Sequence, residues 1–208
     1  MVVPKKRKVA VWGLGNHALK NIIPAIYALK DLDLYGVHSR NKNIVKECCI
    51  NWHCKSWASV KDMLSDPNID IIYLATPPGL HYEHGLKVLE SNKHFWCEKP
   101  FTTDLHSSQK LIDISVEKNL SVFEGFMYLY HPQFKRLKQY IDDKMFGAPK
   151  TVYCRFGLPK LDNPGFRFNK KLGGSCLLDV GSYPLSAILS LFPDKKIEIV
   201  DSFMQKSN

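Results

Sequence analysis

The residues that most constrain this chain form a glycine turn close to its N-terminus, Gly13-Leu14-Gly15-Asn16-His17-Ala18. A short uncharged, β-branched run leads into the turn, and the residues after it read as a helix. This is the strand–turn–helix context that a dinucleotide fingerprint requires. Gly13 permits the tight turn, Gly15 lets the backbone approach a pyrophosphate, and Ala18 lets the helix pack close to the strand. Because a helix start favours phosphate charge, the turn, including Asn16, predicts cofactor binding.

Beyond the turn, short apolar strands alternate with amphipathic helices as far as residue 123. Such alternation is typical of an α/β fold with a doubly wound parallel sheet, and we expect a Rossmann domain over residues 1–123. The expected strands after the first are Leu32–His38, Ile69–Ala75, His94–Cys97 and Ser121–Phe123, and the expected helices are Asn43–Asn51, Val60–Leu64, Leu80–Ser91 and a segment from Asp104 to about Lys118.

The second strand ends in Ser39-Arg40, about twenty residues past the turn, where an acidic residue would hold the ribose hydroxyl of NAD. No acidic residue stands there. A forked cation at Arg40 and a hydroxyl at Ser39 suit a 2′-phosphate instead. The alternative is that Arg40 is a solvated loop residue. We favour NADP as the cofactor, with NAD as second choice.

The carboxyl ends of parallel strands face the ligand crevice of an open α/β sheet. Thr76-Pro77 follows one expected strand and Glu98-Lys99 follows the next. We therefore expect all four residues to bind the cofactor. His81, which begins the helix after Thr76-Pro77, is expected to line this crevice or cap its helix rather than act as a base.

From Glu124 onward the regular alternation stops, so residues 124–208 are expected to form a second, partial domain. The expected elements are a helix over His131–Lys144, a strand over Thr151–Phe156, an irregular loop over Pro159–Lys171, a helix of about twenty residues opened by Gly173-Gly174-Ser175, and a last strand over Ile197–Phe203. Two strands and two helices make a poor free-standing domain. We expect an incomplete α+β domain that either extends the first domain or belongs to a larger sheet.

The composition is that of a soluble globular protein, with 45% hydrophobic and 24% charged residues. No apolar run approaches the length needed to span a bilayer, and no signal peptide is recognisable, so we expect a cytoplasmic protein without membrane contact. The net charge of +9 is dispersed and lacks interleaved aromatic residues, which argues against nucleic acid. The basic run Pro4–Val9 has the form of a nuclear import signal; the alternative is a basic lead-in whose Lys8 and Val9 already belong to the first strand.

The six cysteines show no paired spacing and are expected to be reduced thiols. Cys48, Cys49 and Cys54, with His53 beside them, invite interpretation as a zinc site. No second pair of ligands follows at a suitable spacing, so buried apolar cysteines are the favoured interpretation and no metal is expected.

Five segments, taken in order, resemble the glucose–fructose oxidoreductase / inositol dehydrogenase / rhizopine catabolism family (Gfo/Idh/MocA). They are the glycine turn, Ala75-Thr76-Pro77 with His81, Glu98-Lys99-Pro100, the run from Glu124 to Pro132, and the run from Gly173 to Tyr183. The resemblance implies hydride transfer between a nicotinamide and a carbinol or carbonyl carbon of a sugar, cyclitol or related ring. Tyrosine stands at 183, where many members have histidine.

The same resemblance implies roles for individual residues. Lys99 would stabilise developing alkoxide charge, Tyr183 would donate the proton in reduction, and Asp179 would orient the substrate or hold Lys99 charged. Asp179 and Tyr183 are spaced i, i+4, so both would point from one face of a helix. Tyr128 and Arg167 are candidate substrate contacts. Each residue could instead be structural, as a solvated lysine, a paired carboxylate or a core tyrosine.

Two departures from the family pattern stand out. Leu129 occupies a position where relatives often have arginine, and typical relatives extend further and complete a large sheet that often forms a dimer. An NADP-dependent sugar oxidoreductase is therefore the leading interpretation, and the C-terminal sheet is the surface through which a homo-oligomer would form. A non-catalytic cofactor-binding regulator or a truncated inactive member is the alternative.

Overall fold

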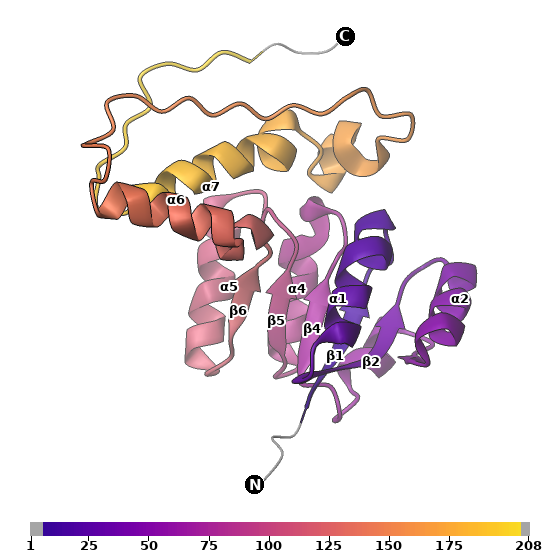
Figure 1. The fold of residues 1–208 in the computed structure, drawn as a ribbon. Helices are drawn as coiled ribbons and strands as arrows, with labels where there is room; N and C mark the ends of the chain where they lie inside the picture. The colour runs from indigo at the N-terminus through magenta and orange to yellow at the C-terminus, as the bar shows by residue number, and fades with distance from the viewer. Residues whose placement is uncertain (1–5, 205–208) are drawn as a thin grey trace, which may run out of the picture. The chain divides into compact units, whose positions relative to one another are not determined.

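The computed structural model describes residues 6–204 and contains a six-stranded parallel sheet (Figure 1). The strand order is β3-β2-β1-β4-β5-β6, so the chain winds outward from β1 in both directions. The strands are β1 (Arg7–Trp12), β2 (Leu32–His38), β3 (Lys55–Ser56), β4 (Ile71–Leu74), β5 (His94–Cys97) and β6 (Val122–Glu124). This is the doubly wound sheet that the alternating pattern predicted, and β2 and β5 have the expected bounds.

Seven α-helices connect or follow the strands of the described chain. They are α1 (Ile23–Ala28), α2 (Lys42–Trp52), α3 (Val60–Leu64), α4 (His81–Glu90), α5 (Leu105–Glu117), α6 (Pro132–Asp142) and α7 (Ser182–Leu191). Shorter 3₁₀ and π turns are η1 (Ala18–Ile22), η2 (Pro78–Leu80), η3 (Met127–Tyr130), η4 (Gly165–Phe168), η5 (Lys170–Leu172) and η6 (Leu177–Gly181). Local signals define several starts: Asn41 caps α2, Ser59 forms a capping box on α3, and Asp104 caps α5.

The sheet separates two apolar cores, because successive residues of a strand point to opposite faces. In β1, Val9 and Val11 join one core with residues of α1 and α2, whereas Ala10 and Trp12 join the other with residues of α3, α4 and α5. Val9, Ala10 and Val11 are fully buried. The rigid double-sided packing holds the carboxyl ends of the central strands at one edge.

The basic run at the start of the chain enters this sheet. Pro4 and Lys5 lie outside the described residues, while Arg7–Val9 belong to β1. Lys8 lies over the ring of Tyr35, 4.5 Å from its centroid, and Arg7 pairs with Asp70 at 3.5 Å. Lys8 and Val9 thus belong to the first strand, as the second interpretation of this run expected.

The chain divides into two compact units. The first runs through Phe126 and also includes Gly157–Ser182; the second comprises Met127–Phe156 and the chain from Tyr183. Residues 157–182 therefore pack with the sheet domain although they follow the boundary expected from the sequence. Within the second unit, Tyr128 of η3 packs edge-on against Phe134 of α6, with ring centroids 4.9 Å apart.

Two expected strands do not form. Residues 151–156 and 197–203 are extended segments without strand pairing, and no strand is present in the described part of the second unit. Tyr153 is 93% exposed and Val200 is 97% exposed. A strand needs a partner for its N–H and C=O groups, and these segments have none among the described residues.

The helix expected after Gly173 is also less regular than predicted. Its first turn, η6, is π-helical, and α7 continues from Ser182. By length and composition alone, the helical stretch Lys170–Leu191 could cross a membrane: it has 22 residues, a mean hydropathy of 1.2, and 11% of its most apolar window is buried. The expectation that no segment approaches this length was therefore wrong. One such helix is weak evidence for a membrane span. This helical stretch also carries the ion-paired Asp179, and a charged side chain is costly in hydrocarbon, which argues against a span.

Candidate active site

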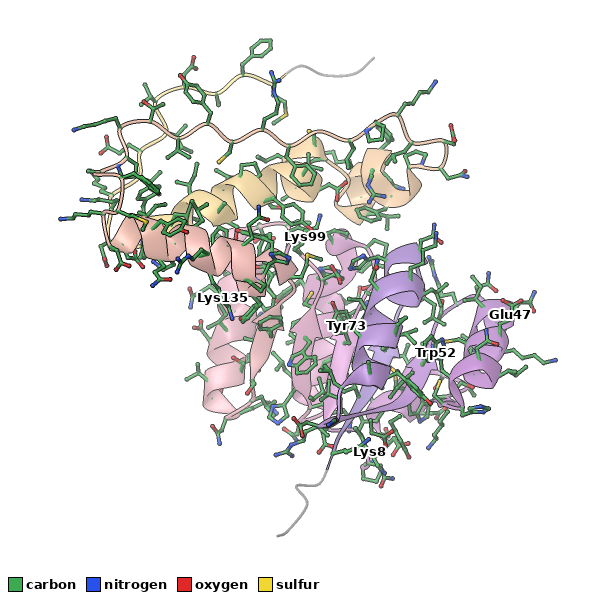
Figure 2. The ribbon with its side chains drawn as sticks, viewed as in Figure 1. Lys8, Glu47, Trp52, Tyr73, Lys99 and Lys135 are labelled. Carbon is green, nitrogen blue, oxygen red and sulfur yellow. The ribbon has the colours of Figure 1, made fainter. Side chains whose placement is uncertain are left out.

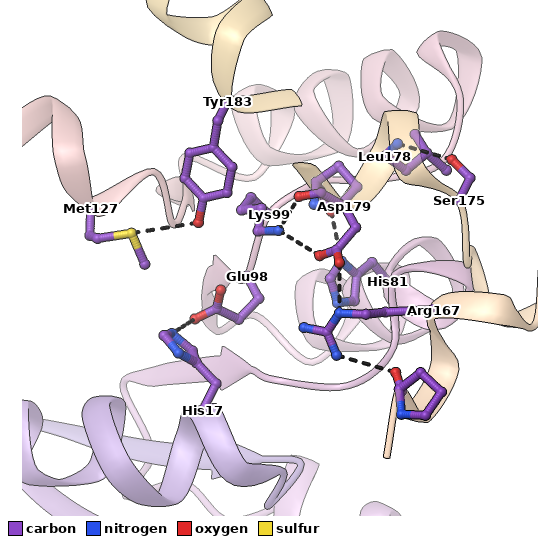
Figure 3. A network of polar contacts seen from close by, with 12 residues as sticks. His17, His81, Glu98, Lys99, Met127, Arg167, Ser175, Leu178, Asp179 and Tyr183 are labelled. Atoms are coloured by element: carbon purple, nitrogen blue, oxygen red, sulfur yellow. Dashed lines mark hydrogen bonds and ion pairs between the residues drawn. The ribbon is translucent and has the colours of Figure 1, made fainter. Parts of the chain in front are cut away.

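Lys99 and Asp179, 80 residues apart in the chain, form an ion pair in the first unit (Figure 3). Lys99 lies just past the carboxyl end of β5, and its Nζ donates to Asp179 Oδ1 at 2.9 Å and to the backbone oxygen of Asp179 at 2.5 Å. The side chains are only 13% and 10% exposed. A half-desolvated ammonium with a fixed orientation can hydrogen-bond a substrate oxygen and stabilise negative charge that develops on it.

Arg167 holds the other oxygen of the same carboxylate. Its Nε donates to Asp179 Oδ2 at 2.7 Å, and its Nη1 donates to the backbone oxygen of Pro164 at 3.2 Å. Burial acts to raise the pKa of Asp179, but Lys99 and Arg167 outweigh it and hold this pKa below its ordinary value. The carboxylate therefore stays charged at neutral pH and orients both cations.

Glu98, the residue before Lys99, forms a second charged pair with His17. Glu98 Oε1 lies 3.1 Å from His17 Nε2 and accepts a 2.6 Å hydrogen bond from the hydroxyl of Tyr73. Burial acts to raise the pKa of Glu98, but the hydrogen bonds from His17 and Tyr73 outweigh it and lower this pKa. The same hydrogen bond to Glu98 raises the pKa of His17. The pair connects the glycine turn with the loop that carries Lys99.

His81 is completely buried and joins two loops rather than facing an open crevice. Its Nδ1 lies 2.9 Å from the backbone oxygen of Pro100, and its Nε2 lies 2.7 Å from that of Thr76. Burial lowers the pKa of His81, so the ring is neutral and has one N–H to donate. His81 thus holds the loop after β4 against the loop after β5, and it has no access to solvent through which it could act as a base.

The glycine turn has the shape that a bound pyrophosphate needs. Gly13 has φ +108°, and a Cβ there would lie 2.6 Å from the backbone oxygen of Ala75. Above Gly15, by contrast, a Cβ would meet no atom within 4 Å. Ala18 is buried against the core at the start of η1, while Asn16 is exposed beside the open space. The turn is closed on the sheet side and open on the other, as a phosphate cradle requires.

The remaining expected cofactor residues lie in the loops after β2 and β4. Ser39 is half-buried and Arg40 is exposed; the backbone N–H of Gly13 donates to the oxygen of His38 at 2.9 Å, which keeps this loop beside the turn. Thr76 and Pro77 are half-buried, and Thr76 Oγ1 is 3.2 Å from His84 Nδ1. These loops join the strand ends at one edge of the sheet. Their cofactor contacts stay predictions.

Tyr183 and Tyr128 belong to the second unit. The ring of Tyr183 stacks on Phe156, with centroids 5.0 Å apart and planes at 8°, and its hydroxyl donates to the Met127 sulfur at 3.8 Å. The hydroxyl of Tyr128 donates to Ser186 Oγ at 2.9 Å. The roles expected for both tyrosines stay predictions.

Several side chains around this site were not expected from the sequence. His17 and Tyr73 both hold Glu98, and His84 stacks on Trp12 with ring centroids 4.1 Å apart at 17°. Nothing in the local sequence signals these contacts, because each joins residues from separate strands or helices. Between residues 6 and 204, no group of three or more His, Cys, Asp or Glu side chains is arranged to hold a metal ion.

Comparison with known families decides the classification. Residues 7–126 match the profile described as "Oxidoreductase family, NAD-binding Rossmann fold", and residues 134–208 match the GFO/IDH/MocA C-terminal domain. The chain belongs to the GFO/IDH/MocA oxidoreductase family. The resemblance inferred from the five segments is thereby confirmed.

Individual members of the GFO/IDH/MocA family are similar over most of this chain. A dTDP-3,4-didehydro-2,6-dideoxy-alpha-D-glucose 3-reductase from Saccharopolyspora spinosa is 29% identical over 183 residues, which is 88% of this chain and 55% of that protein. A trans-1,2-dihydrobenzene-1,2-diol dehydrogenase from Xenopus tropicalis is 27% identical, covering 83% of this chain and 49% of its own length. The chain therefore spans about half the length of these relatives.

A solved structure agrees with the fold of this family member. A 3-ketoreductase from Actinomadura kijaniata, in complex with NADP and TDP-benzene, has a TM-score of 0.86 at 26% sequence identity. The match covers 90% of this chain and 58% of that protein. The parallel sheet followed by a C-terminal domain is thus the arrangement of the structural neighbour as well.

Proposed function

We propose that this chain carries an NADP-dependent oxidoreductase site that transfers a hydride between a nicotinamide and a carbinol or carbonyl carbon of a sugar-derived substrate. The observation that carries the proposal is the Lys99–Asp179 pair, a half-buried cation at the end of β5, in the same unit as a glycine turn that is open on one side. A fixed ammonium beside a dinucleotide site suits reduction of a carbonyl, where negative charge develops on oxygen.

The relatives support the choice of substrate class and cofactor. The Saccharopolyspora spinosa relative is a dTDP-keto-sugar reductase, and the Actinomadura kijaniata 3-ketoreductase was solved with NADP. The exposed Arg40 after β2 and the lack of an acidic residue there favour NADP over NAD. A sugar or sugar nucleotide is thus a better candidate than a free cyclitol.

The bound nicotinamide would supply or accept the hydride, and this chain's residues would do the rest. The N–H groups around Gly15 and the start of η1 would hold the pyrophosphate, and Ser39 and Arg40 would hold the 2′-phosphate. Lys99 would donate a hydrogen bond to the reacting oxygen while Asp179 keeps Lys99 oriented. Tyr183 is our candidate proton donor for that oxygen, by resemblance to the family's tyrosine-containing members. Tyr128 and Arg167 remain candidates for substrate contact.

A second candidate function is a cofactor-binding regulator without turnover. It is favoured by one observation: in the described part of the chain, segments 151–156 and 197–203 of the second unit pair with no strand. A substrate domain without a sheet would not exclude water from the reaction. Retention of Lys99, Asp179 and Tyr183 argues for the enzyme. Exchange of Lys99 for alanine should lower turnover strongly under the first proposal and leave partner binding intact under the second.

We also propose self-association through these extended segments. Tyr153, Ile199, Val200 and Phe203 are 87–97% exposed, and large exposed apolar side chains are often found at contact sites. Light scattering coupled to size-exclusion chromatography tests this directly: a dimer supports the proposal, and a monomer over a wide concentration range contradicts it.

The first experiment is a titration of the purified chain with NADPH and, separately, with NADH. Trp12 immediately precedes the glycine turn, so energy transfer from tryptophan to the reduced nicotinamide should report binding. Saturable binding that favours NADPH supports the cofactor site and justifies a screen of keto sugars and their nucleotides for oxidation of NADPH. Absence of binding by a folded chain contradicts both candidate functions.

A further inference from the structure

A groove of about 530 Å³ runs along α2, beside the edge strand β3. Its floor is one face of α2, where lining residues recur at the three- and four-residue spacing of a helix face. Its opposite wall is the segment Ser56–Ala58. The lining residues are Lys42, Val45, Lys46, Cys49, Ile50, Ser56, Trp57 and Ala58. The groove thus has an apolar floor with a thiol in it.

The two charged residues that line this groove are both lysines. Lys42 and Lys46 are one turn apart on α2, and Lys42 Nζ reaches across to the backbone oxygen of Ala58 at 3.2 Å. None of the eight lining residues is acidic, and Glu47, the acidic residue of α2, projects from the outer side of this helix (Figure 2). The groove therefore favours a small molecule with negative charge.

Cys49 belongs to a cluster of three thiols. Cys48, Cys49 and Cys54 are free cysteines that pack together at the end of α2, where His53 turns the chain back in a left-handed conformation. Cys54 interacts with both other thiols: the hydrogen bond with Cys48 is the main reason that the pKa of Cys54 is raised and the pKa of Cys48 is lowered. Cys48 is buried, whereas Cys49 and Cys54 are half-buried.

A thiol in an accessible basic groove, with a second thiol in contact, is the arrangement that thiol–disulfide exchange needs. We propose that this groove is an exchange site for a small anionic disulfide of the glutathione type. In the first step the Cys49 thiolate attacks the disulfide, forms a mixed disulfide and releases one thiol. In the second step Cys54 attacks the Cys49 sulfur, forms the Cys49–Cys54 disulfide and releases the second thiol. The protein loses two electrons and two protons, and the small disulfide is reduced to two thiols.

The test uses the chain without cofactor, so its outcome does not depend on the proposed function. The reduced protein is treated with glutathione disulfide, quenched by acid, and digested with trypsin without reduction. The peptide over residues 47–55 contains all three thiols and can be sequenced by tandem mass spectrometry. We expect it to lose two hydrogens through a Cys49–Cys54 bond, before exposed Cys154 and Cys176 acquire glutathione. A bond to Cys48 instead, or reaction no faster than at Cys154 and Cys176, overturns the proposal.

Two sets of variants separate the steps. Cys54→Ser should accumulate one glutathione on Cys49, and Cys49→Ser should prevent the adduct in this peptide. Lys42→Gln combined with Lys46→Gln should slow the reaction with glutathione disulfide about tenfold, as electrostatic attraction predicts, and should not slow reaction with the cationic disulfide cystamine. Lys110→Gln, at an exposed position of α5, is the control. Equal slowing by the control variant contradicts a charge-guided site, and so does slowing of the Lys42/Lys46 double variant with both disulfides. The disulfide mapping on the wild-type protein tests the proposal even if a variant fails to fold.

Discussion

His17 Nε2 lies 3.1 Å from Glu98 Oε1, so an ion pair ties the glycine turn after β1 to the residue before Lys99. The two segments carry different parts of the candidate site, the glycine turn and the Lys99 ammonium. Their relative position is therefore set by this contact as well as by the pairing of β1 with β4 and of β4 with β5. The contact also makes the site sensitive to pH.

Exchange of His17 for glutamine should remove a pH-dependent contribution to stability. Because the pKa of His17 is raised by Glu98, the pair stabilises the fold fully below the ordinary histidine pKa of about 6.5, and this stabilisation is lost as pH rises through the raised value. The side chain of His17 is 43% exposed, so the effect should be a few tenths to about 1 kcal/mol. Urea unfolding at pH 6 and pH 9 measures this difference in the free energy of unfolding, and His106→Gln serves as an exposed control. If the stability of wild type and of His17→Gln changes with pH to the same extent, the His17–Glu98 pair does not contribute as proposed.

Alanine at the two glycines of the turn should have opposite consequences. Gly13→Ala places a Cβ 2.6 Å from the backbone oxygen of Ala75 at a positive φ, which should cost about 1–3 kcal/mol of stability. Gly15→Ala meets nothing within 4 Å, so stability should change by less than about 0.5 kcal/mol while NADPH binding weakens. Chemical denaturation and the NADPH titration are measured on both variants. Unchanged NADPH affinity in Gly15→Ala would show that the cofactor does not approach this glycine.

Exchange of Lys99 for alanine should lower kcat by about 10²–10³, because the ammonium that stabilises charge on the reacting oxygen is lost. Lys118→Ala, which removes an exposed lysine bound to Asn92, is the matched control. Steady-state kinetics with the best keto-sugar substrate gives the comparison, and circular dichroism checks the fold. A variant that retains most of the wild-type kcat would remove Lys99 from the mechanism.

Arg167 variants should shift the pH profile through Asp179. Arg167 is one of the cations that keep the pKa of Asp179 low, so Arg167→Gln should raise this pKa, and the acid side of the kcat/KM profile should move to higher pH. Arg167→Lys should restore part of the shift because a positive charge remains. An unchanged profile accompanied by a higher KM would indicate direct substrate contact instead.

Exchange of Arg40 for alanine should reduce the preference for NADPH over NADH. A charge-assisted bond to the 2′-phosphate contributes about 1.5–3 kcal/mol, so we expect the ratio of the two affinities to fall by about ten- to a hundredfold. Parallel titrations with the two cofactors measure this ratio. Lys42→Ala, two residues further along, tests whether any nearby cation has the same effect.

Much of the sheet domain could be predicted because its signals are local. The β-branched run, the two glycines and Ala18 lie within ten consecutive residues, and Asp104 caps its helix at the expected place. The continuous apolar character of Ile71–Leu74 follows from burial on both faces of a parallel strand. The same reasoning missed β3, which has only two residues, too few to show a period.

Prediction was weaker where a feature depends on a distant partner. Strands were expected over 151–156 and 197–203, but a strand forms only if another strand accepts its hydrogen bonds, and none does among the described residues. His81 illustrates the same limit for the site. Its sequence position suggests a residue beside the crevice, whereas the packing of two loops around it buries it completely.

The sequence by itself determined the family, the parallel sheet and the positions of the glycine turn, Lys99, Asp179 and Tyr183 along the chain, because each depends on patterns within a few residues. Only the tertiary structure decided that Lys99 and Arg167 share the carboxylate of Asp179, that His17 holds Glu98, and that Cys49 lines a groove together with two lysines. These contacts join residues from different elements. Their geometry follows from how the helices and loops pack on the sheet, which no local pattern encodes.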